Sequence, residues 1–495
     1  MSARQVCAAK CGRWRLRAAP SLLLVPTSIL LAAIAGCTAN VSSVSPTSVT
    51  EAGPAFKVTV LGSGFTAGST VQWNGANRTT TYVSATELVA QINAADIAAT
   101  GSGSITVTNP LTTGTTSSGS SSGASNAKTI SIVAPSIDAT DFQIDPAHDG
   151  AVTFSSVSFP TAATWSVNLG SGTPSNLVVA DSRIFLTIGT SGGSRLLALS
   201  QTTGGTSWGP KAIAGTAGGS AGVAYDGGRV FVAEDDSGGS TLYAYDATSG
   251  ALDWSTALGA SSPGAPTAAD GYVYVIVSGS ATLDALDETT GAIAWQQSLS
   301  QASGIPAVTA DGVYVTATTS ACFAVDLRPA TGEVIWDSSG SAGSCPQAAT
   351  PAVANQSVYS PISSGTAIFA TETGGSTGTL SDSLPAAFTS TMAYFWESPN
   401  LDAVNLSGNT VQWTFNGDND LNTPPIIVNG QYVITGSSLG HLYAVDATSG
   451  SSVWTQSLTG GVEQVAAGDG LLLAVSETGD DSSGTLTAYT LATNP

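Results

Sequence analysis

The sequence predicts an all-β protein, in which a small β-sandwich is followed by an eight-bladed β-propeller that an N-terminal strand closes. Glycine accounts for 56 of the 495 residues and only 9% are charged. This composition is typical of short strands joined by tight turns. One strand-like segment recurs eight times in the second part of the chain. Several alternating apolar segments precede these repeats between residues 41 and 134.

The N-terminus has the layout of an export signal. A basic region ends at Arg17, and the apolar stretch of residues 21–35 is too short to span a bilayer comfortably. The stretch ends in Ile-Ala-Gly-Cys, which resembles the bacterial lipobox. This resemblance implies a lipoprotein signal peptide at 1–36, lipidation of Cys37 and a lipid anchor at 37–40. The alternative is an ordinary cleaved signal peptide with a chance cysteine. Stable anchoring needs more than one acyl chain.

The part of the chain after Cys37 is strongly acidic. It contains eight Lys and Arg against 34 Asp and Glu, a net charge of −26. Such a surface repels nucleic acid and anionic lipid headgroups, so we expect no nucleic-acid partner. It is compatible with basic partners, divalent cations and neutral sugars. Simple solubility of an acidic secreted protein is the alternative explanation.

Residues 41–134 are predicted to form the sandwich. Alternating strands begin at Phe56 and Val71, and an Asn-Gly hairpin turn follows at Asn74. The elements Val-Leu-Gly-Ser-Gly-Phe, Val-Gln-Trp-Asn-Gly and Val-Thr-Asn-Pro resemble the IPT/TIG family of immunoglobulin-like (Ig-like) domains. The resemblance implies that residues 129–133 are the last strand and that 112–126 form a long hairpin loop. Domains of this family mostly act as spacers or binding modules.

The repeats have the length of a four-stranded propeller blade. Each carries a Leu-x-Ala-x-Asp-like strand, a Thr-x-Gly turn and, in most copies, a strand with a tryptophan. The spacing averages about 41 residues, as in propeller blades. Asx-Gly turns supply the positive φ of the preceding hairpin. The third strands start at Leu196, Leu242, Leu283, Cys322, Ile368, Leu401, Leu442 and Leu486.

The eighth repeat lacks a fourth strand of its own, because almost no chain follows Leu486. The segment 164–169, which contains Trp165, is a lone fourth strand and is expected to complete it. Without this closure both ends would present unpaired edges. The repeats resemble the pyrroloquinoline-quinone-type (PQQ-like) propeller repeat, and residues 142–150 resemble the segment before its first blade. We therefore expect a lead-in at 135–162 and the propeller at 163–495.

The repeated tryptophans are expected to fill the gaps between blades, with Leu380 in the place of one of them. Quinone-dependent dehydrogenases of this superfamily carry adjacent cysteines, calcium ligands and a catalytic aspartate at motif positions. The sequence has no Cys-Cys pair and no matching ligand set. We therefore predict no catalytic residue, no cofactor and no metal. Gly-x-Ser-x-Gly matches are expected by chance in a chain so rich in Gly and Ser, and none lies on a strand-to-helix turn.

Two groups of residues are candidate sites. Cys322 and Cys345 are predicted to form a disulfide that closes 23 residues, with two unrelated buried thiols as the alternative. Six acids in loops of the same propeller face form a candidate cation site or a dock for a basic partner: Asp235, Asp236, Asp418, Asp420, Asp480 and Asp481. Solvated loop charge is the simpler explanation, because the run at 416–420 lacks a closing glutamate at calcium-loop spacing.

Together these features predict a monomeric, non-catalytic binding or scaffolding lipoprotein of the bacterial cell envelope. The resemblance implies a functional analogue in the propeller lipoprotein of the outer-membrane β-barrel assembly machinery. The partner would be an envelope protein, and the alternative is a glycan bound by a cell-surface adhesion protein. A quinone-dependent dehydrogenase is a third hypothesis. Thr38 after the cysteine favours the outer membrane or cell surface as the location.

Overall fold

The computed structural model describes residues 39–50, 55–99, 101–110, 124–133, 138–154, 156–215, 222–236, 238–260, 262–318, 322–338, 345–346, 349–478 and 483–491. The chain divides into two compact units, Met1–Ser45 with Glu51–Ile132 and Pro46–Thr50 with Val133–Pro495. The described secondary structure consists of strands and one short 3₁₀ helix, Ala94–Ile97, which confirms the all-β prediction. Cys37 and the predicted signal peptide lie outside the described residues.

The first unit contains two antiparallel sheets with strand orders β1-β3-β7-β6 and β9-β8-β4-β5. Buried side chains alternate along β3 and β4, and Val58, Val60 and Trp73 belong to the core. Positive φ at Asn74 and Gly75 closes the β4–β5 hairpin, as the Asn-Gly pair predicts. The strands are β1 Asn40–Ser45, β3 Phe56–Ser63, β4 Thr70–Trp73, β5 Ala76–Asn77, β6 Thr80–Ser84, β7 Glu87–Ile92, β8 Gly101–Thr108 and β9 Lys128–Val133, while β2 Ser48–Thr50 belongs to the second unit.

The described residues of the second unit form eight sheets, which we number sheet 1 to sheet 8 in chain order. Sheet 1 contains β12 Thr173–Pro174, β13 Val178–Ala180, β14 Arg183–Thr190, β15 Gly193–Ser200 and β16 Thr206–Ala214. Sheet 2 contains β17 Val223–Asp226, β18 Arg229–Asp236, β19 Gly239–Asp246 and β20 Leu252–Ala257. Sheet 3 contains β21 Thr267–Ala269, β22 Tyr272–Val277, β23 Thr282–Asp287 and β24 Ile293–Ser298. Sheet 4 contains β25 Ala307–Val308, β26 Val313–Thr318, β27 Cys322–Leu327 and β28 Val334–Asp337.

The remaining sheets repeat this order of strands. Sheet 5 contains β29 Ala352–Ala354, β30 Ser357–Ile362, β31 Gly365–Ala370 and β32 Ser376–Leu380. Sheet 6 contains β33 Ala386–Phe388, β34 Met392–Glu397, β35 Asn400–Asn405 and β36 Thr410–Phe415. Sheet 7 contains β10 Ala151–Val152, β37 Ile426–Val428, β38 Tyr432–Gly436, β39 His441–Asp446 and β40 Ser452–Ser457. Sheet 8 contains β41 Gly461–Gly468, β42 Leu471–Glu477, β43 Ser483–Thr490 and β11 Trp165–Ser171.

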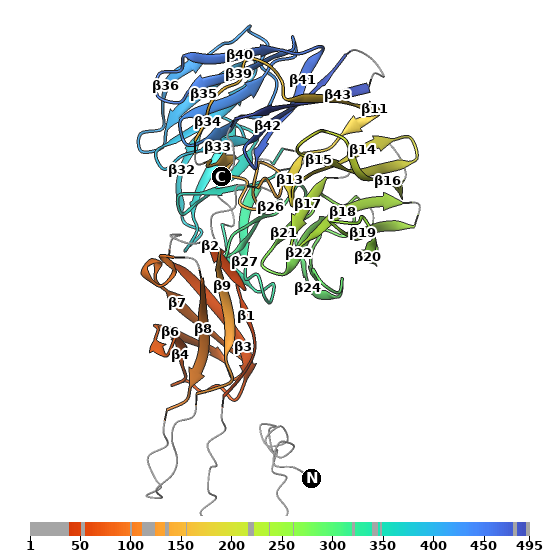
Figure 1. Ribbon diagram of the computed structural model, residues 1–495. Helices are drawn as coiled ribbons and strands as arrows, with labels where there is room; N and C mark the ends of the chain where they lie inside the picture. The colour runs from red at the N-terminus through yellow and green to blue at the C-terminus, as the bar shows by residue number, and fades with distance from the viewer. Residues whose placement is uncertain are drawn as a thin grey trace, which may run out of the picture. The chain divides into compact units, whose positions relative to one another are not determined.

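Sheet 8 is assembled from both ends of the repeat region. The N-terminal strand β11 pairs antiparallel with β43, and Trp165 lies opposite Ala488. Figure 1 shows the yellow β11 beside the blue β43. Strand β13 of sheet 1 also contacts β41 of sheet 8.

Tryptophans on the outer strands hold neighbouring sheets together. Each indole Nε1 donates a hydrogen bond of 2.7–3.1 Å to a backbone carbonyl on the adjoining segment. A turn glycine of the next sheet packs against the ring in six cases. A β-carbon on Gly250, for example, would lie 2.6 Å from Trp208 Cδ2. These tryptophans are Trp165, Trp208, Trp254, Trp295, Trp336, Trp413 and, without such a glycine, Trp454.

The junction between sheets 5 and 6 is different, and here the sequence assignment was wrong. The register pairs Ile368 with Gly378, so Gly378 and not Leu380 takes the place that tryptophan has in the other sheets. Asn409 stands at the facing turn with φ 49°, and its Nδ2 donates to Thr379 O at 3.4 Å. The prediction failed because it placed the third strand two residues too late, and the β-bulge beside Ile368 fixes the true register.

Candidate functional site: the central cavity

The lead-in residues 138–154 run along the inner strands of seven sheets in chain order. Ala139 exchanges two backbone hydrogen bonds with Val179 of β13, at 2.9 and 2.6 Å. Successive lead-in carbonyls then accept one amide each from β17, β25, β29, β33 and β37 at 2.6–2.9 Å, while β21 donates to the Asp141 side chain. The accepting carbonyls belong to Thr140, Pro146, Ala147, Asp149 and Gly150. The lead-in thereby satisfies inner-edge amides that would otherwise lack partners.

Backbone strain accompanies this path. Gln143, Ile144 and His148 adopt φ values of 51°, 80° and 61°. For a β-branched residue such as Ile144 this region is a genuine outlier, which persists only where the surroundings enforce it. Here Ile144 is buried in the core between sheets 1, 7 and 8, and Gln143 Nε2 donates to the carbonyls of Ala386 and Pro425. The strained turn therefore holds a fixed shape beneath the cavity.

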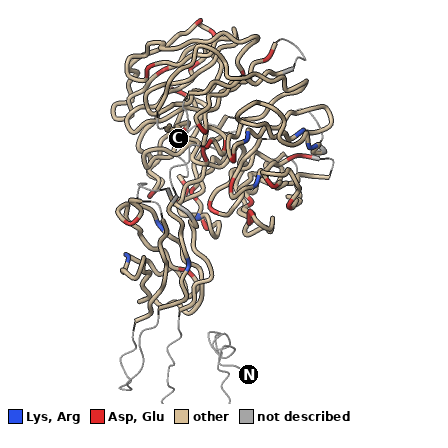
Figure 2. The backbone as a smooth tube through the Cα atoms, viewed as in Figure 1, with Lys and Arg blue, Asp and Glu red and all other residues tan. Residues whose placement is uncertain are grey.

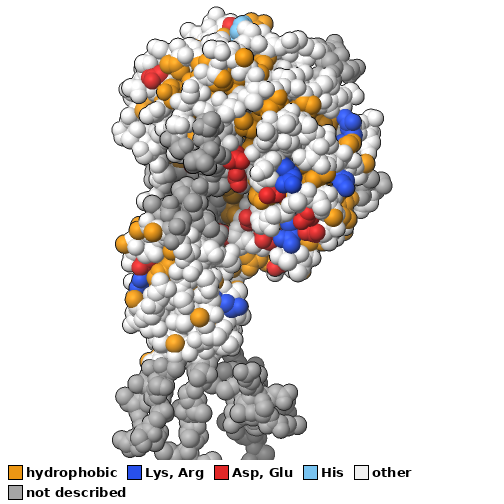
Figure 3. Space-filling model, in the orientation of Figure 1, with side chains coloured by type: hydrophobic (Ala, Val, Ile, Leu, Met, Phe, Trp, Pro, Cys, Tyr) orange, Lys and Arg blue, Asp and Glu red, His pale blue; other side chains and the backbone are white. Residues whose placement is uncertain are grey.

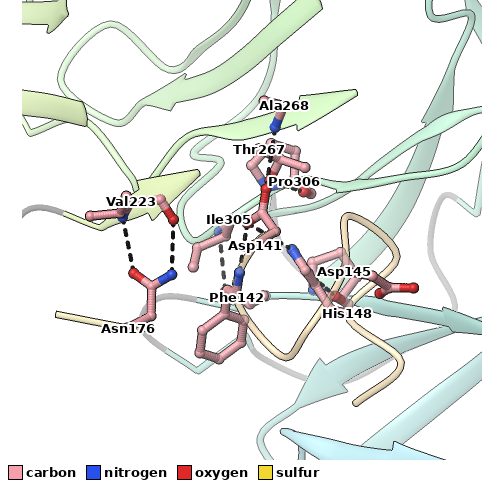
Figure 4. Close-up of polar contacts among 12 residues, drawn as sticks. Asp141, Phe142, Asp145, His148, Asn176, Val223, Thr267, Ala268, Ile305 and Pro306 are labelled. Atoms are coloured by element: carbon pink, nitrogen blue, oxygen red, sulfur yellow. Dashed lines mark hydrogen bonds and ion pairs between the residues drawn. The ribbon is translucent and has the colours of Figure 1, made fainter. Parts of the chain in front are cut away.

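Buried titratable side chains lie along the same segment (Figure 4). The Asp141 carboxylate accepts from Phe142 N at 2.7 Å and from Ala268 N at 3.2 Å. Burial raises the pKa of Asp141 well above its ordinary value and the pKa of Asp145 to about 6. Burial, together with the neighbouring Asp145 charge, raises the pKa of Asp149. Burial therefore makes all three carboxyl groups easier to protonate than exposed ones.

His148 is held neutral. Burial lowers its pKa to about 4, against the raising effect of the hydrogen bond that Nδ1 donates to Pro351 O at 3.0 Å. This bond places the proton on Nδ1, so that Nε2 is an acceptor; it has no hydrogen-bond partner and lies 4.0 Å from Asp141 Oδ1. Within the described residues, no three His, Cys, Asp or Glu side chains are arranged to hold a metal ion.

A cavity of about 390 Å³ lies beside this segment. Lead-in residues 141–144 line it, together with residues on or just before the first strands of sheets 1, 2, 3, 4, 7 and 8 and with Ala233 of β18. Glycines let these segments pack tightly: a β-carbon on Gly222 would clash with Ala265, and one on Gly264 would clash with the carbonyl of Gly304. The wall is therefore built from closely packed backbone and is not a loose set of loops.

The cavity lining is rich in hydrogen-bond acceptors and carries no Lys or Arg. Glu463 is exposed on the wall. The neighbouring Gln464 donates through Nε2 to Pro174 O at 2.9 Å, while its Oε1 is buried without a hydrogen-bond partner. The pKa of Glu477 is raised by burial and by the Glu463 charge. Negative charge at this wall is thus not neutralised by a neighbouring cation of the lining.

The six loop acids singled out in the sequence do not form one cluster among the described residues. Asp235 lies on β18 of sheet 2, where Ser240 Oγ donates to it at 3.5 Å, and Asp236 ends the same strand. Asp418 and Asp420 precede sheet 7, and Asp480 and Asp481 lie outside the described residues. Figure 2 shows acids spread over the second unit. Their binding role stays a prediction.

Asp418 has a well-defined local role. It accepts from Ser437 Oγ at 2.6 Å and from His441 Nδ1 at 2.7 Å, and Asp420 accepts from Ser438 Oγ. Burial acts to raise the pKa of Asp418, but these hydrogen bonds hold it below its ordinary value. Ser437 Oγ and the His441 imidazole both donate to the carboxylate, and only the backbone amide of His441 donates to Ser437 Oγ. This Ser-His-Asp set therefore lacks the imidazole–hydroxyl hydrogen bond that activates a serine nucleophile.

The structure joins Cys322, at the start of β27, to Cys345 by a disulfide with a Cα–Cα distance of 4.9 Å.

The sequence did not predict the cavity residues Asp141, Glu463 and Gln464. Asp141, Asp145 and Asp149 recur at intervals of four in the sequence, which was the one available signal. No sequence pattern marked Glu463 and Gln464, because their place in the cavity depends on contacts among six sheets.

Comparison with known proteins identifies both parts of the chain. A family model described as outer membrane protein assembly factor BamB (PQQ_2) matches residues 192–392 and 398–494, and the IPT/TIG domain model matches 39–125. A search of the curated proteins found no match. No helix in the described part of the chain is long and apolar enough to cross a membrane.

Solved structures share the fold. BamB from Moraxella catarrhalis is 20% identical with a TM-score of 0.50, covering 68% of this chain and 98% of its own. Quinohemoprotein alcohol dehydrogenase from Comamonas testosteroni is 15% identical with a TM-score of 0.56, covering 72% and 81%. A europium-containing methanol dehydrogenase is 13% identical with a TM-score of 0.54, covering 72% and 98%. The family model covers more than half of the chain, which therefore belongs to the PQQ-like propeller family described as outer membrane protein assembly factor BamB and carries an N-terminal IPT/TIG domain.

Proposed function

We propose that this chain is a non-catalytic scaffolding lipoprotein of the bacterial cell envelope that binds other envelope proteins. The observation that carries the proposal is the lead-in. Six of its carbonyls, those of Ala139, Thr140, Pro146, Ala147, Asp149 and Gly150, and Asp141 Oδ2 accept inner-strand amides, so these polar groups help to hold the fold together. The family description as an outer membrane protein assembly factor, and the fold shared with BamB, support the same function.

We further infer that the eight sheets are the blades of one closed propeller, with β11 as the closing strand. The pairing of β11 with β43 and the contact between β13 and β41 support this inference. A closed ring has no exposed edges at its ends, which suits a protein that must stay folded outside the cell. The Cys322–Cys345 bond suits the same oxidising location.

The dehydrogenase fold relatives raise the question whether a quinone cofactor fits the cavity. Pyrroloquinoline quinone carries three carboxylates, which need cationic partners in a buried site. The cavity lining offers Asp141 and Glu463 and no Lys or Arg. The residues present do not fit this cofactor, and the proposed function involves no step through it.

The proposed anchor is a lipid on Cys37, with the Ig-like domain as a spacer and the outer membrane or cell surface as the location. Its test is metabolic labelling with palmitate. Label in the wild-type protein and none in Cys37→Ala are expected. Equal labelling of the two proteins would contradict the anchor without affecting the propeller.

The scaffolding function is tested by crosslinking the intact lipoprotein in its host and identifying what copurifies. We expect proteins of the β-barrel assembly pathway. Retention on polysaccharide columns, with no protein recovered, would contradict this expectation and favour the adhesion alternative. Turnover of alcohols with added quinone and calcium would contradict the non-catalytic part of the proposal.

A further inference from the structure

We propose that the central cavity binds the arginine or lysine side chain of an extended segment of a partner protein. The inference rests on the scaffolding function proposed above and names the chemistry by which the partner would be recognised. Three independent features of the cavity support it: acceptors without donors, the absence of a competing cation, and the size and composition of the wall.

The first feature is a hydrogen-bond acceptor on the cavity wall that lacks a donor. Gln464 Nε2 donates a hydrogen bond to Pro174 O at 2.9 Å, and Gln464 Oε1 is buried without a donor. Glu463, an exposed carboxylate, lines the same cavity. A buried acceptor without a donor is costly, and a charged donor such as guanidinium or ammonium satisfies it with a strong hydrogen bond.

The protein supplies no cation of its own at this place. Of the five Lys and Arg residues in the second unit, none lines the cavity. Two of them pair with exposed acids elsewhere, Arg183 with Asp181 at 2.7 Å and Arg229 with Asp253 at 3.0 Å. Figure 3 shows such basic side chains among acids on the visible surface. An incoming cation therefore has no competitor within the site.

The wall suits a side chain on a strand of backbone. Leu177, Ile426 and Ala466 provide apolar surface on which the methylene stem of Arg or Lys would lie. The volume of about 390 Å³ is near the lower end of the range of about 300–1,000 Å³ for ligand pockets. It admits one long side chain with its neighbouring backbone, and the glycine-packed segments hold this shape in advance.

The first test uses defined probes on the purified mature protein. Calorimetry compares the capped tripeptide Gly-Arg-Gly with the same peptide carrying citrulline, which has the shape of arginine without its charge. We expect citrulline to bind about tenfold more weakly or not at all, and the arginine peptide to weaken with added salt. Equal affinities would overturn the proposal. Arginine amide binding as tightly as the tripeptide would assign the site to small amines and overturn the peptide part.

Variants locate the binding. Glu463→Gln and Gln464→Leu each should weaken the arginine peptide about tenfold, because each removes an acceptor for a charged donor. Glu463→Lys should abolish binding by placing a cation in the cavity. Glu372→Gln, the same charge change in an exposed turn of sheet 5, is the matched control and should bind as wild type. Melting temperatures equal to wild type show that each variant is folded.

The in vivo crosslinking experiment separates the two proposals. Loss of partners in Glu463→Lys, with partners retained in Glu372→Lys, the same charge reversal in an exposed turn, supports both. Retention of all partners in Glu463→Lys leaves the scaffolding function intact and overturns the cavity inference. Absence of partners from the wild-type protein, combined with binding of the arginine peptide, contradicts the scaffolding function alone.

Discussion

The six-membered ring of Trp208 occupies the space that a β-carbon on Gly250 would need. Gly250 also has φ +66°, and a β-carbon would lie 2.6 Å from Trp208 Cδ2. Five other turn glycines meet a tryptophan in the same way. Two requirements, positive φ and a contact with no room for a side chain, thus coincide at one residue, which explains the recurring Thr-x-Gly turn.

We predict that Gly250→Ala lowers the free energy of unfolding by about 2–4 kcal/mol, through the positive φ and the overpacking against Trp208. Urea unfolding followed by tryptophan fluorescence measures this loss. Gly228→Ala on the same sheet is the control, because Gly228 has φ +80° and open space around it. It should cost only about 1 kcal/mol. Equal losses in the two variants would show that the tryptophan contact is not important.

At the scale of elements, the lead-in should stabilise the propeller through the Asp141 side chain as well as through its backbone. Asp141 accepts two backbone amides. Asp141→Asn should cost about 1 kcal/mol, because its amide nitrogen replaces one acceptor, and Asp141→Leu about 3 kcal/mol, because both amides lose their partner. Calorimetric unfolding gives both values. A leucine variant as stable as the asparagine variant would contradict this role.

The junction between sheets 5 and 6 should be the weakest point of the repeat region. Gly378 and Asn409 replace the indole–glycine contact found at the junctions between sheets 1 and 2, 2 and 3, 3 and 4, 4 and 5, and 6 and 7. Few apolar contacts favour local opening. Hydrogen exchange followed by mass spectrometry should show faster exchange in β32 than in β28, which carries Trp336. Equal protection of the two strands would contradict the expectation.

The sequence predicted elements well where local pattern decides them. The eight third strands, the Asn74–Gly75 hairpin and the packing role of the tryptophans follow from alternation, turn chemistry and repetition. It failed at Gly378, because it placed the third strand of sheet 5 two residues too late. The sequence also did not predict the cavity, because Asp141, Glu463 and Gln464 come together only through contacts between distant sheets.

At the scale of the whole molecule, buried carboxyl groups should make stability depend on pH. Burial raises the pKa of Asp270 to about 8, of Glu288 to about 7 and of Asp145 to about 6. The folded state binds these protons more tightly than the unfolded chain does, so the stabilisation is complete below about pH 4 and is lost as the pH rises through 6 to 8. His148, with its pKa lowered to about 4, acts in the opposite sense, but only below about pH 6.5.

We therefore predict that the melting temperature falls from pH 6.5 to 8.5 at constant ionic strength. Scanning calorimetry measures the trend. Asp270→Asn should flatten it, since asparagine keeps the turn, with its φ of 55°, but carries no proton that is lost in this range. A melting temperature that rises over this interval would contradict the assignment.

The pairing of β11 with β43 sets an order of events during synthesis. Trp165 cannot pair until Ala488, more than 300 residues later, has been synthesised, so sheet 8 forms last. Through all of that time β11 has an unpaired edge, and such edges invite pairing with other chains. Contacts between residues so far apart in the sequence also form slowly. A nascent chain of this kind depends on protection of β11 until its final residues have been made.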